Sequence, residues 1–111
     1  MFLSEEATLG GGVRLRRVEV VFHRDEGGLI PDGDGVRLLF EYRGVSCYAF
    51  LAREVLDDIG RTSYRTFAER AEVVKAQIAV FQSAIIAKLE AANARARRVV
   101  ISHEDLPPEL F

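Results

Sequence analysis

The sequence predicts a small α+β domain, in which an antiparallel sheet of three or four strands packs against one short and one long helix. Three observations predict this class. Several segments alternate side chains as strands do, one long segment repeats apolar residues every three to four positions, and a valine-rich segment follows it. The helices would cover the apolar face of the sheet.

A two-residue period marks the strands. In RRVEVVFH, residues 16–23, Val18, Val20 and Phe22 share one side of an extended chain. VRLLFEYR, residues 36–43, repeats this pattern, and Gly44 then permits a tight reversal into VSCYAFLA. The sequence therefore predicts an antiparallel hairpin.

A period of three to four residues marks the helices. Residues 52–59 suit a short helix that Gly60 would end. Residues 64 to about 93 contain no proline or glycine and predict one long helix. Its apolar stripe consists of Phe67, Ala71, Val74, Ile78, Phe81, Ile85 and Leu89. RRVVIS, residues 97–102, then predicts a final strand.

Length and composition bound the organisation. The 111 residues, 49% of them hydrophobic, suit one domain at 13–106, with an N-terminal arm at 1–12 and a C-terminal tail at 107–111. A net charge of −2 gives no general attraction to nucleic acid or anionic membrane. No apolar run approaches the roughly 20 residues that span a bilayer, and MFLSEEATLGGG lacks the features of a signal peptide. We expect a cytoplasmic protein without a membrane partner.

Four short motifs lie between residues 36 and 106: a hairpin around Gly-Val-x-Cys, a helix with Glu-x-Leu, a helix with Phe and Arg three residues apart, and a valine-rich strand ending near Asp. Their positions are Gly44, Val45, Cys47, Glu54, Leu56, Phe67, Arg70, Val99, Ile101 and Asp105. In these motifs the chain resembles the domain of unknown function 1488 family of small bacterial proteins. The resemblance implies the fold and brings no activity or catalytic residue with it.

The stretch IPDGDGVRLLFE resembles part of a calcium loop. With Gly35 at the glycine position of an EF-hand, Asp32, Asp34 and Glu41 fall on ligand positions. Ile30, however, would hold the first position without a side-chain oxygen, and the residues leading to Glu41 alternate as a strand. We therefore expect consecutive turns and a strand entry instead of an ion site.

Two histidines lie among acids at the ends of predicted strands. If the first and last strands are neighbours, His23 with Asp25 and His103 with Asp105 could form a metal or acid–base site. Solvated loop residues are the more common explanation, and no cofactor is predicted. Cys47 shares a strand face with apolar residues, which predicts a small buried hydrophobe and not a nucleophile.

Nucleic-acid binding is the alternative from another function class. Two basic clusters suggest it: Arg14, Arg16 and Arg17, and Arg95, Arg97 and Arg98. The second cluster follows the long helix, where cations are favoured by the helix dipole, and no aromatic residues are interleaved for base stacking. These observations favour a protein partner over nucleic acid.

Self-association is the leading hypothesis. About 30 helical residues span about 45 Å, which exceeds the diameter of about 34 Å of a compact domain of this length, so the helix must overhang or break. It also carries a second face that one sheet cannot cover: Val73, Val80, Ala84, Ala87 and Ala91. The sequence thus predicts a non-catalytic structural or protein-interaction module that forms a homodimer through this face.

We predict that millimolar calcium leaves the melting temperature unchanged, because an ion that bound the native state would raise it by mass action. Thermal unfolding with and without calcium checks this. A calcium-dependent rise that Asp34→Ala abolished would contradict it.

Overall fold

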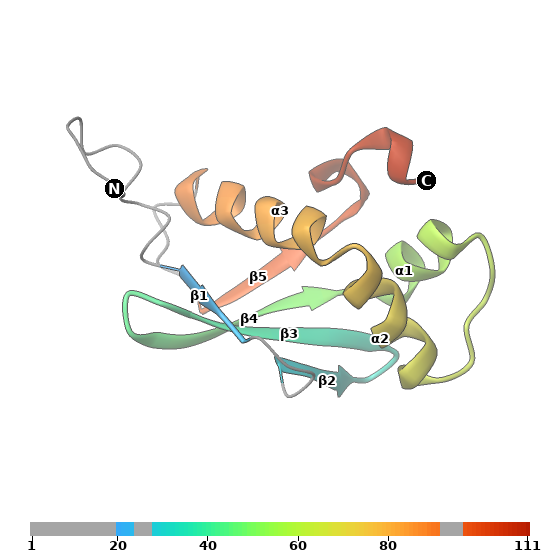
Figure 1. Ribbon diagram of the computed structural model, residues 1–111, viewed down its shortest axis with the longest axis horizontal. Coiled ribbons are helices and arrows are strands. Elements are labelled where there is room, and N and C mark those ends of the chain that lie inside the picture. Colours follow the sequence, from blue (N-terminus) through green and yellow to red (C-terminus); the bar gives the residue numbers. More distant parts are fainter. Residues whose placement is uncertain (1–19, 24–27, 92–96) are drawn as a thin grey trace.

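A mixed sheet with helices over one of its faces forms the domain in the computed structural model of the chain (Figure 1). The structure describes residues 20–23, 28–91 and 97–111. The elements are β1 (Val20–Phe22), β2 (Leu29–Asp32), β3 (Gly35–Tyr42), β4 (Val45–Leu51), α1 (Arg53–Gly60), α2 (Phe67–Ala76), α3 (Ile78–Ala91) and β5 (Arg98–Ile101), followed by 3₁₀ turns at His103–Asp105 and Pro108–Leu110. The predicted α+β class is confirmed.

The predicted hairpin is β3–β4. Its strands pair from Val36 opposite Leu51 to Tyr42 opposite Val45. Arg43 and Gly44 form the two-residue turn with φ of 54° and 77°. Two consecutive positive φ values are the requirement of a type I′ turn, which matches the twist of the flanking strands.

β1 and β2 share one edge of β3. Phe22 lies opposite Phe40, and Leu29 lies opposite Leu38, so the two short strands are consecutive parts of one edge. The described part of the sheet therefore contains five strands but is four strand positions wide. β2 was expected to be part of a series of turns. It forms a strand because Pro31, which lacks an amide hydrogen, is tolerated at a sheet edge.

The sequence predicted an antiparallel sheet, but the sheet is mixed. β5 pairs with β4 in parallel, with Val99 opposite Ala49 and Ile101 opposite Leu51. Three helices carry the chain back across the sheet before β5 begins, and such a crossover makes the two neighbouring strands run in the same direction.

The single long helix of the prediction is two helices, α2 and α3. They meet at Gln77, whose φ is −115° and whose amide is shared between the carbonyls of Val73 and Val74. α2 contacts β3 and α3 contacts β5, so the break lets the segment follow a twisted sheet that a straight helix would leave. No helix among the described residues has both the length and the apolarity needed to cross a membrane.

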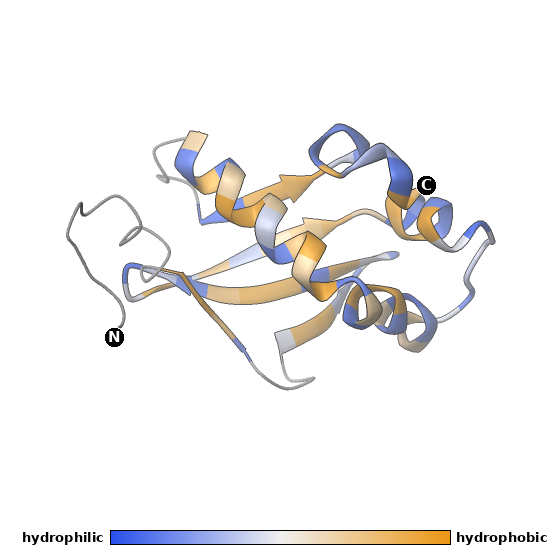
Figure 2. Ribbon diagram, turned by 45° about the horizontal axis from the view of Figure 1, so that its top comes forward, coloured by the Kyte–Doolittle hydropathy of each residue, from blue (hydrophilic) through white to orange (hydrophobic). Residues whose placement is uncertain are grey.

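The core lies between the sheet and the helices. Figure 2 shows hydrophobic residues concentrated along the strands and on the helices above them. The largest fully buried side chains of this core are Phe40, Phe81, Leu51, Leu56, Ile85, Ile101, Val36 and Val74. The C-terminal tail takes part as well, because Leu110 and Phe111 pack against this core.

Cys47 is buried, as the sequence predicted, with 6% of its surface exposed. Burial raises the pKa of its thiol above the ordinary value, so little thiolate forms at neutral pH.

We predict that a thiol reagent labels Cys47 only in denaturant, as thiol titration would measure. Rapid stoichiometric labelling of the folded protein would contradict this.

Candidate functional site

The two histidines lie at opposite edges of the sheet. His23 follows β1, which pairs with β3 at one edge of the described sheet, and His103 follows β5, which pairs with β4 at the other edge. The strand adjacency that the metal or acid–base hypothesis required is absent, and Asp25 lies outside the described residues. Within residues 20–23, 28–91 and 97–111, no group of three or more His, Cys, Asp or Glu side chains is placed to hold a metal.

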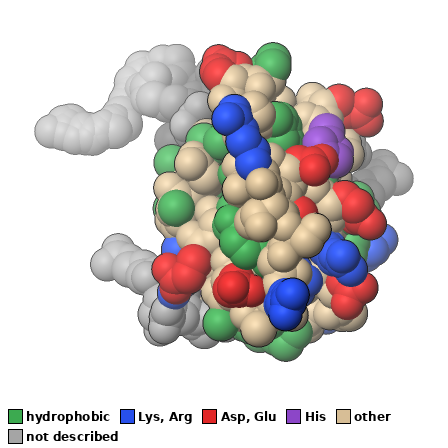
Figure 3. Space-filling view, turned by 90° about the vertical axis from the view of Figure 1, so that its right-hand side faces the viewer, with side chains coloured by type: hydrophobic (Ala, Val, Ile, Leu, Met, Phe, Trp, Pro, Cys, Tyr) green, Lys and Arg blue, Asp and Glu red, His purple; other side chains and the backbone are tan. Residues whose placement is uncertain are grey.

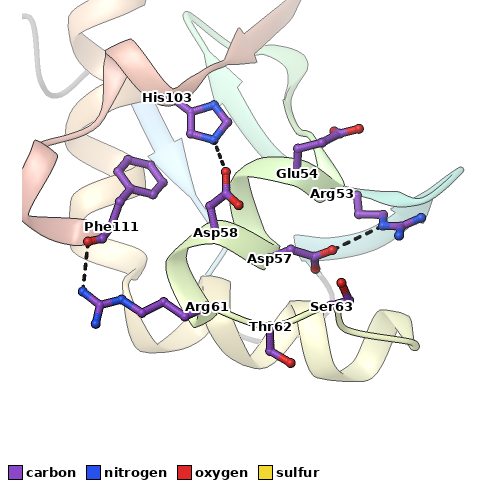
Figure 4. A pocket seen from close by; sticks show the side chains of 9 residues that line it. All are labelled: Arg53, Glu54, Asp57, Asp58, Arg61, Thr62, Ser63, His103 and Phe111. Atoms are coloured by element: carbon purple, nitrogen blue, oxygen red, sulfur yellow. Dashed lines mark hydrogen bonds and ion pairs between the residues drawn. The ribbon is translucent and has the colours of Figure 1, made fainter.

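His103 has a different carboxylate partner from the one its sequence neighbourhood suggests. Its Nε2 lies 2.7 Å from Asp58 Oδ2 on α1, and its ring lies 5.1 Å from the ring of Phe111 (Figure 4). Arg61 Nη2 donates to the carbonyl oxygen of Phe111 at 3.0 Å. These contacts fasten the C-terminal segment to α1.

These residues belong to a polar pocket of about 830 Å³. Its wall consists of Arg53, Glu54, Asp57, Asp58, Arg61, Thr62, Ser63, His103 and Phe111. Acidic and basic side chains are interspersed over this end of the molecule, with histidine among them (Figure 3). A nucleophilic mechanism would need a hydroxyl or thiol hydrogen-bonded to the base, and among the described residues His103 has no such neighbour.

Asp57 connects this pocket to a buried arginine. The carboxylate accepts from the amide of Tyr64 at 3.2 Å and from Arg53 Nε at 3.3 Å, and Arg70 Nε lies 3.9 Å away. The Arg70 side chain is only 9% exposed, donates to the Tyr64 carbonyl at 2.7 Å, and has no hydrogen-bond partner for Nε. Arg70 is one of the positions of the family resemblance, and the contacts of its side chain stabilise the fold.

Asp105, the other acid of the predicted histidine site, is engaged elsewhere. It accepts from the Ser102 amide at 2.8 Å, from the Ser102 hydroxyl at 3.0 Å and from Lys88 Nζ at 3.0 Å. Burial opposes its charge, but these donors outweigh burial and lower its pKa below the ordinary value. Asp105 therefore ties the turn after β5 to α3.

The calcium-like stretch is the β2–β3 hairpin. Asp32 pairs with Arg37 at 3.1 Å, and Asp34, in the turn, lies 3.6 Å from Arg53. Glu41 lies about 20 Å further along β3 from Gly35, because each strand residue advances about 3.3 Å. The three carboxylates cannot converge on one ion.

The basic clusters are mostly outside the described residues. Arg14, Arg16, Arg17 and Arg95 belong to segments that the structure does not describe. The carbonyl of Arg97 accepts from the Tyr48 amide at 2.9 Å, and the Arg98 guanidinium lies 5.2 Å from the ring centroid of Phe50.

The helix face predicted as an interface is partly covered by its own chain. Ala84 is buried, Val73 and Val80 pack partly against the core, and Ala87 and Ala91 are exposed. A groove of about 440 Å³ runs beside Val80, Ala84 and Ala87. Its other wall contains Asp105 and Pro107.

A surface that the sequence analysis missed is the face of the sheet turned away from the helices. Leu39, Tyr48 and Phe50 project from it at positions that alternate with the buried residues of β3 and β4. A signal was present, because the runs LLF and CYAFL are nearly continuous in apolar residues. Such runs predict strands that are covered on both faces.

Comparison with known proteins supports the fold. A crystal structure of a DUF1488 family protein of unknown function from Shewanella loihica PV-4 matches with a TM-score of 0.62 and 10% identity, covering 75% of this chain and 91% of that one. The fold implied by the family resemblance is therefore confirmed. No family model and no curated protein matches the sequence.

We predict that Asp105→Asn lowers the free energy of unfolding by about 1 to 2 kcal/mol at neutral pH, because charge-assisted hydrogen bonds are weakened. A carboxyl whose pKa is lowered by folding contributes stability above its unfolded pKa of about 3.9, and this contribution is lost as the pH falls. Urea unfolding of wild type and variant should therefore differ less near pH 3 than at neutral pH.

Glu109→Gln, at an exposed position, is the matched control and should leave stability unchanged at both pH values. An equal loss for Asp105→Asn at both pH values would show that the charge of Asp105 is irrelevant.

Proposed function

We propose that this chain is a small structural or protein-interaction module, without a catalytic role, that self-associates as a homodimer. One observation carries the proposal: the domain has more apolar and aromatic surface than its single core covers. Leu39, Tyr48 and Phe50 remain partly exposed on the second face of the sheet, where Val21 and Val100 are 56% and 40% exposed. Exposed surface of this kind marks interaction sites.

The chemistry of the polar pocket supports a structural role for that end of the molecule. Its polar side chains are largely paired with one another, as Arg53 is with Asp57 and His103 is with Asp58. The contact between His103 and Asp58 holds the C-terminal segment against α1.

The α3 face that the sequence favours remains a candidate surface for the dimer, although it exposes less apolar surface than its sequence suggested. Ala84 is buried by the protein's own chain, and Val80 is already partly packed against the core. The exposed remainder, Ala87 and Ala91, consists of methyl groups, which bury little area when two helices meet.

We predict that the wild-type protein sediments as a dimer at about 10 µM and above, in the affinity range of a modest interface. Sedimentation velocity over a concentration series measures this, and native mass spectrometry gives the number of chains and any molecule that copurifies. Sedimentation as a monomer throughout would contradict the proposed self-association.

A further inference from the structure

The uncovered face of the sheet, the one turned away from the helices and covered by no element of the described segments, has an ordered arrangement of rings and guanidinium groups. The guanidinium carbon of Arg37 lies 3.9 Å from the centroid of the Tyr48 ring, and that of Arg98 lies 5.2 Å from the centroid of Phe50. Contacts of this type are favourable at exposed sites and restrict the motion of both groups. A surface that is ordered before binding loses less conformational entropy when a partner arrives.

Gly35 allows Phe50 to lie close to the backbone. A Cβ atom at this position would come within 2.8 Å of Phe50 Cε1 and 2.7 Å of the Leu51 carbonyl oxygen. The phenyl ring therefore occupies the place where a side chain of β3 would otherwise stand. This packing keeps that end of the face low in relief, where another flat surface can approach.

The charges that the described strands place on this face are balanced. Arg37 and Arg98 are matched in number by Asp32 and Glu41, and Arg37 is already paired with Asp32 at 3.1 Å. A surface for nucleic acid needs an excess of positive charge to replace the counterions of the phosphates. A surface that meets a copy of itself must instead avoid excess charge of either sign, since a two-fold interface brings the same patch from both chains together.

The size of the face suits a modest contact with a second copy. The face is about 26 Å long at β3, which has eight residues, but only about 13 Å long at β5, which has four, and it is about 19 Å wide at ordinary strand spacings. Its projected area of about 400 Å² corresponds to a small interface, below the roughly 800 Å² per partner of a standard one.

We propose that the dimer forms through this face, with the sheets of two copies packed against each other at about 10 Å and the helices on the outside. This inference rests on the proposed self-association and names its surface. Leu39, Tyr48 and Phe50 supply the centre of the contact, and Val100 and Arg98 supply the part formed by β5.

The test compares two exposed valines. Val100 projects from the uncovered face and Val45 from the helix side of the sheet near the β3–β4 turn, and their exposures are nearly equal, 40% and 41%. Val100→Glu should weaken dimerisation about a hundredfold or more, because it places an unpaired charge in the contact, whereas Val45→Glu should leave it unchanged. Sedimentation velocity measures association, and circular dichroism verifies folding.

A third variant, Ala87→Glu, examines the α3 surface at an exposed position and should also leave the dimer intact. If Ala87→Glu instead of Val100→Glu produced folded monomers, the sheet-face inference would be overturned while the proposed self-association stood. A wild-type protein that is monomeric throughout would overturn both. If Val100→Glu did not fold, Val100→Ser would take its place, with an expected weakening of about tenfold.

The wild-type protein is also titrated against a fluorescent single-stranded oligonucleotide. Anisotropy should not rise at physiological salt if the face meets a second copy. Binding that Arg98→Glu removed would assign the face to nucleic acid and overturn the inference.

Discussion

Parallel pairing of β4 with β5 is the constraint on which the arrangement of the other elements depends. Parallel neighbours cannot be joined by a tight turn, so the chain has to cross back over the sheet between Leu51 and Arg98. The helices make this crossing, and α2 and α3 lie over the same face (Figure 1). That face is built into the core, while the opposite face is left without a covering element among the described residues.

The same constraint decides which polar residues meet. β5 occupies the edge opposite to β1, which separates His103 from His23. α1 begins directly after β4, and this brings Asp58 to the end of β5, where His103 follows. A hydrogen bond thus joins residues 45 positions apart, and it involves neither of the acids that were expected beside the histidines from the sequence.

Among the residues that the structure describes, Arg70 is the charged one placed in the interior, at the junction of α1 and α2. Burying the guanidinium of Arg70 is costly unless it is compensated, and the compensation comes from the Tyr64 carbonyl and from the nearby carboxylate of Asp57. Asp57 also accepts a hydrogen bond from the Tyr64 amide, so Tyr64, between α1 and α2, is held by polar contacts at both its amide and its carbonyl. Arg70, which belongs to the family resemblance, therefore has a structural role in this fold.

Local patterns determined much of the fold, because the features involved span only a few residues. Alternation in β3 and β4, the Gly44 reversal and the helical period of residues 67–91 each reflect neighbours along the chain. Cys47 was placed correctly for the same reason, since its burial follows from the face it shares with Ala49 and Leu51.

The sequence by itself therefore determined the types of most elements, the hairpin and most of the core. Strand order, the β2 strand, the direction of β5, the break at Gln77 and the partners of His103 were decided by the tertiary structure. A strand with a given alternation can pair in either direction and at either edge, and only contacts between distant segments select one arrangement. The uncovered sheet face belongs to the same group. Its apolar residues are visible in the sequence, but which face the helices leave open depends on how the chain crosses the sheet.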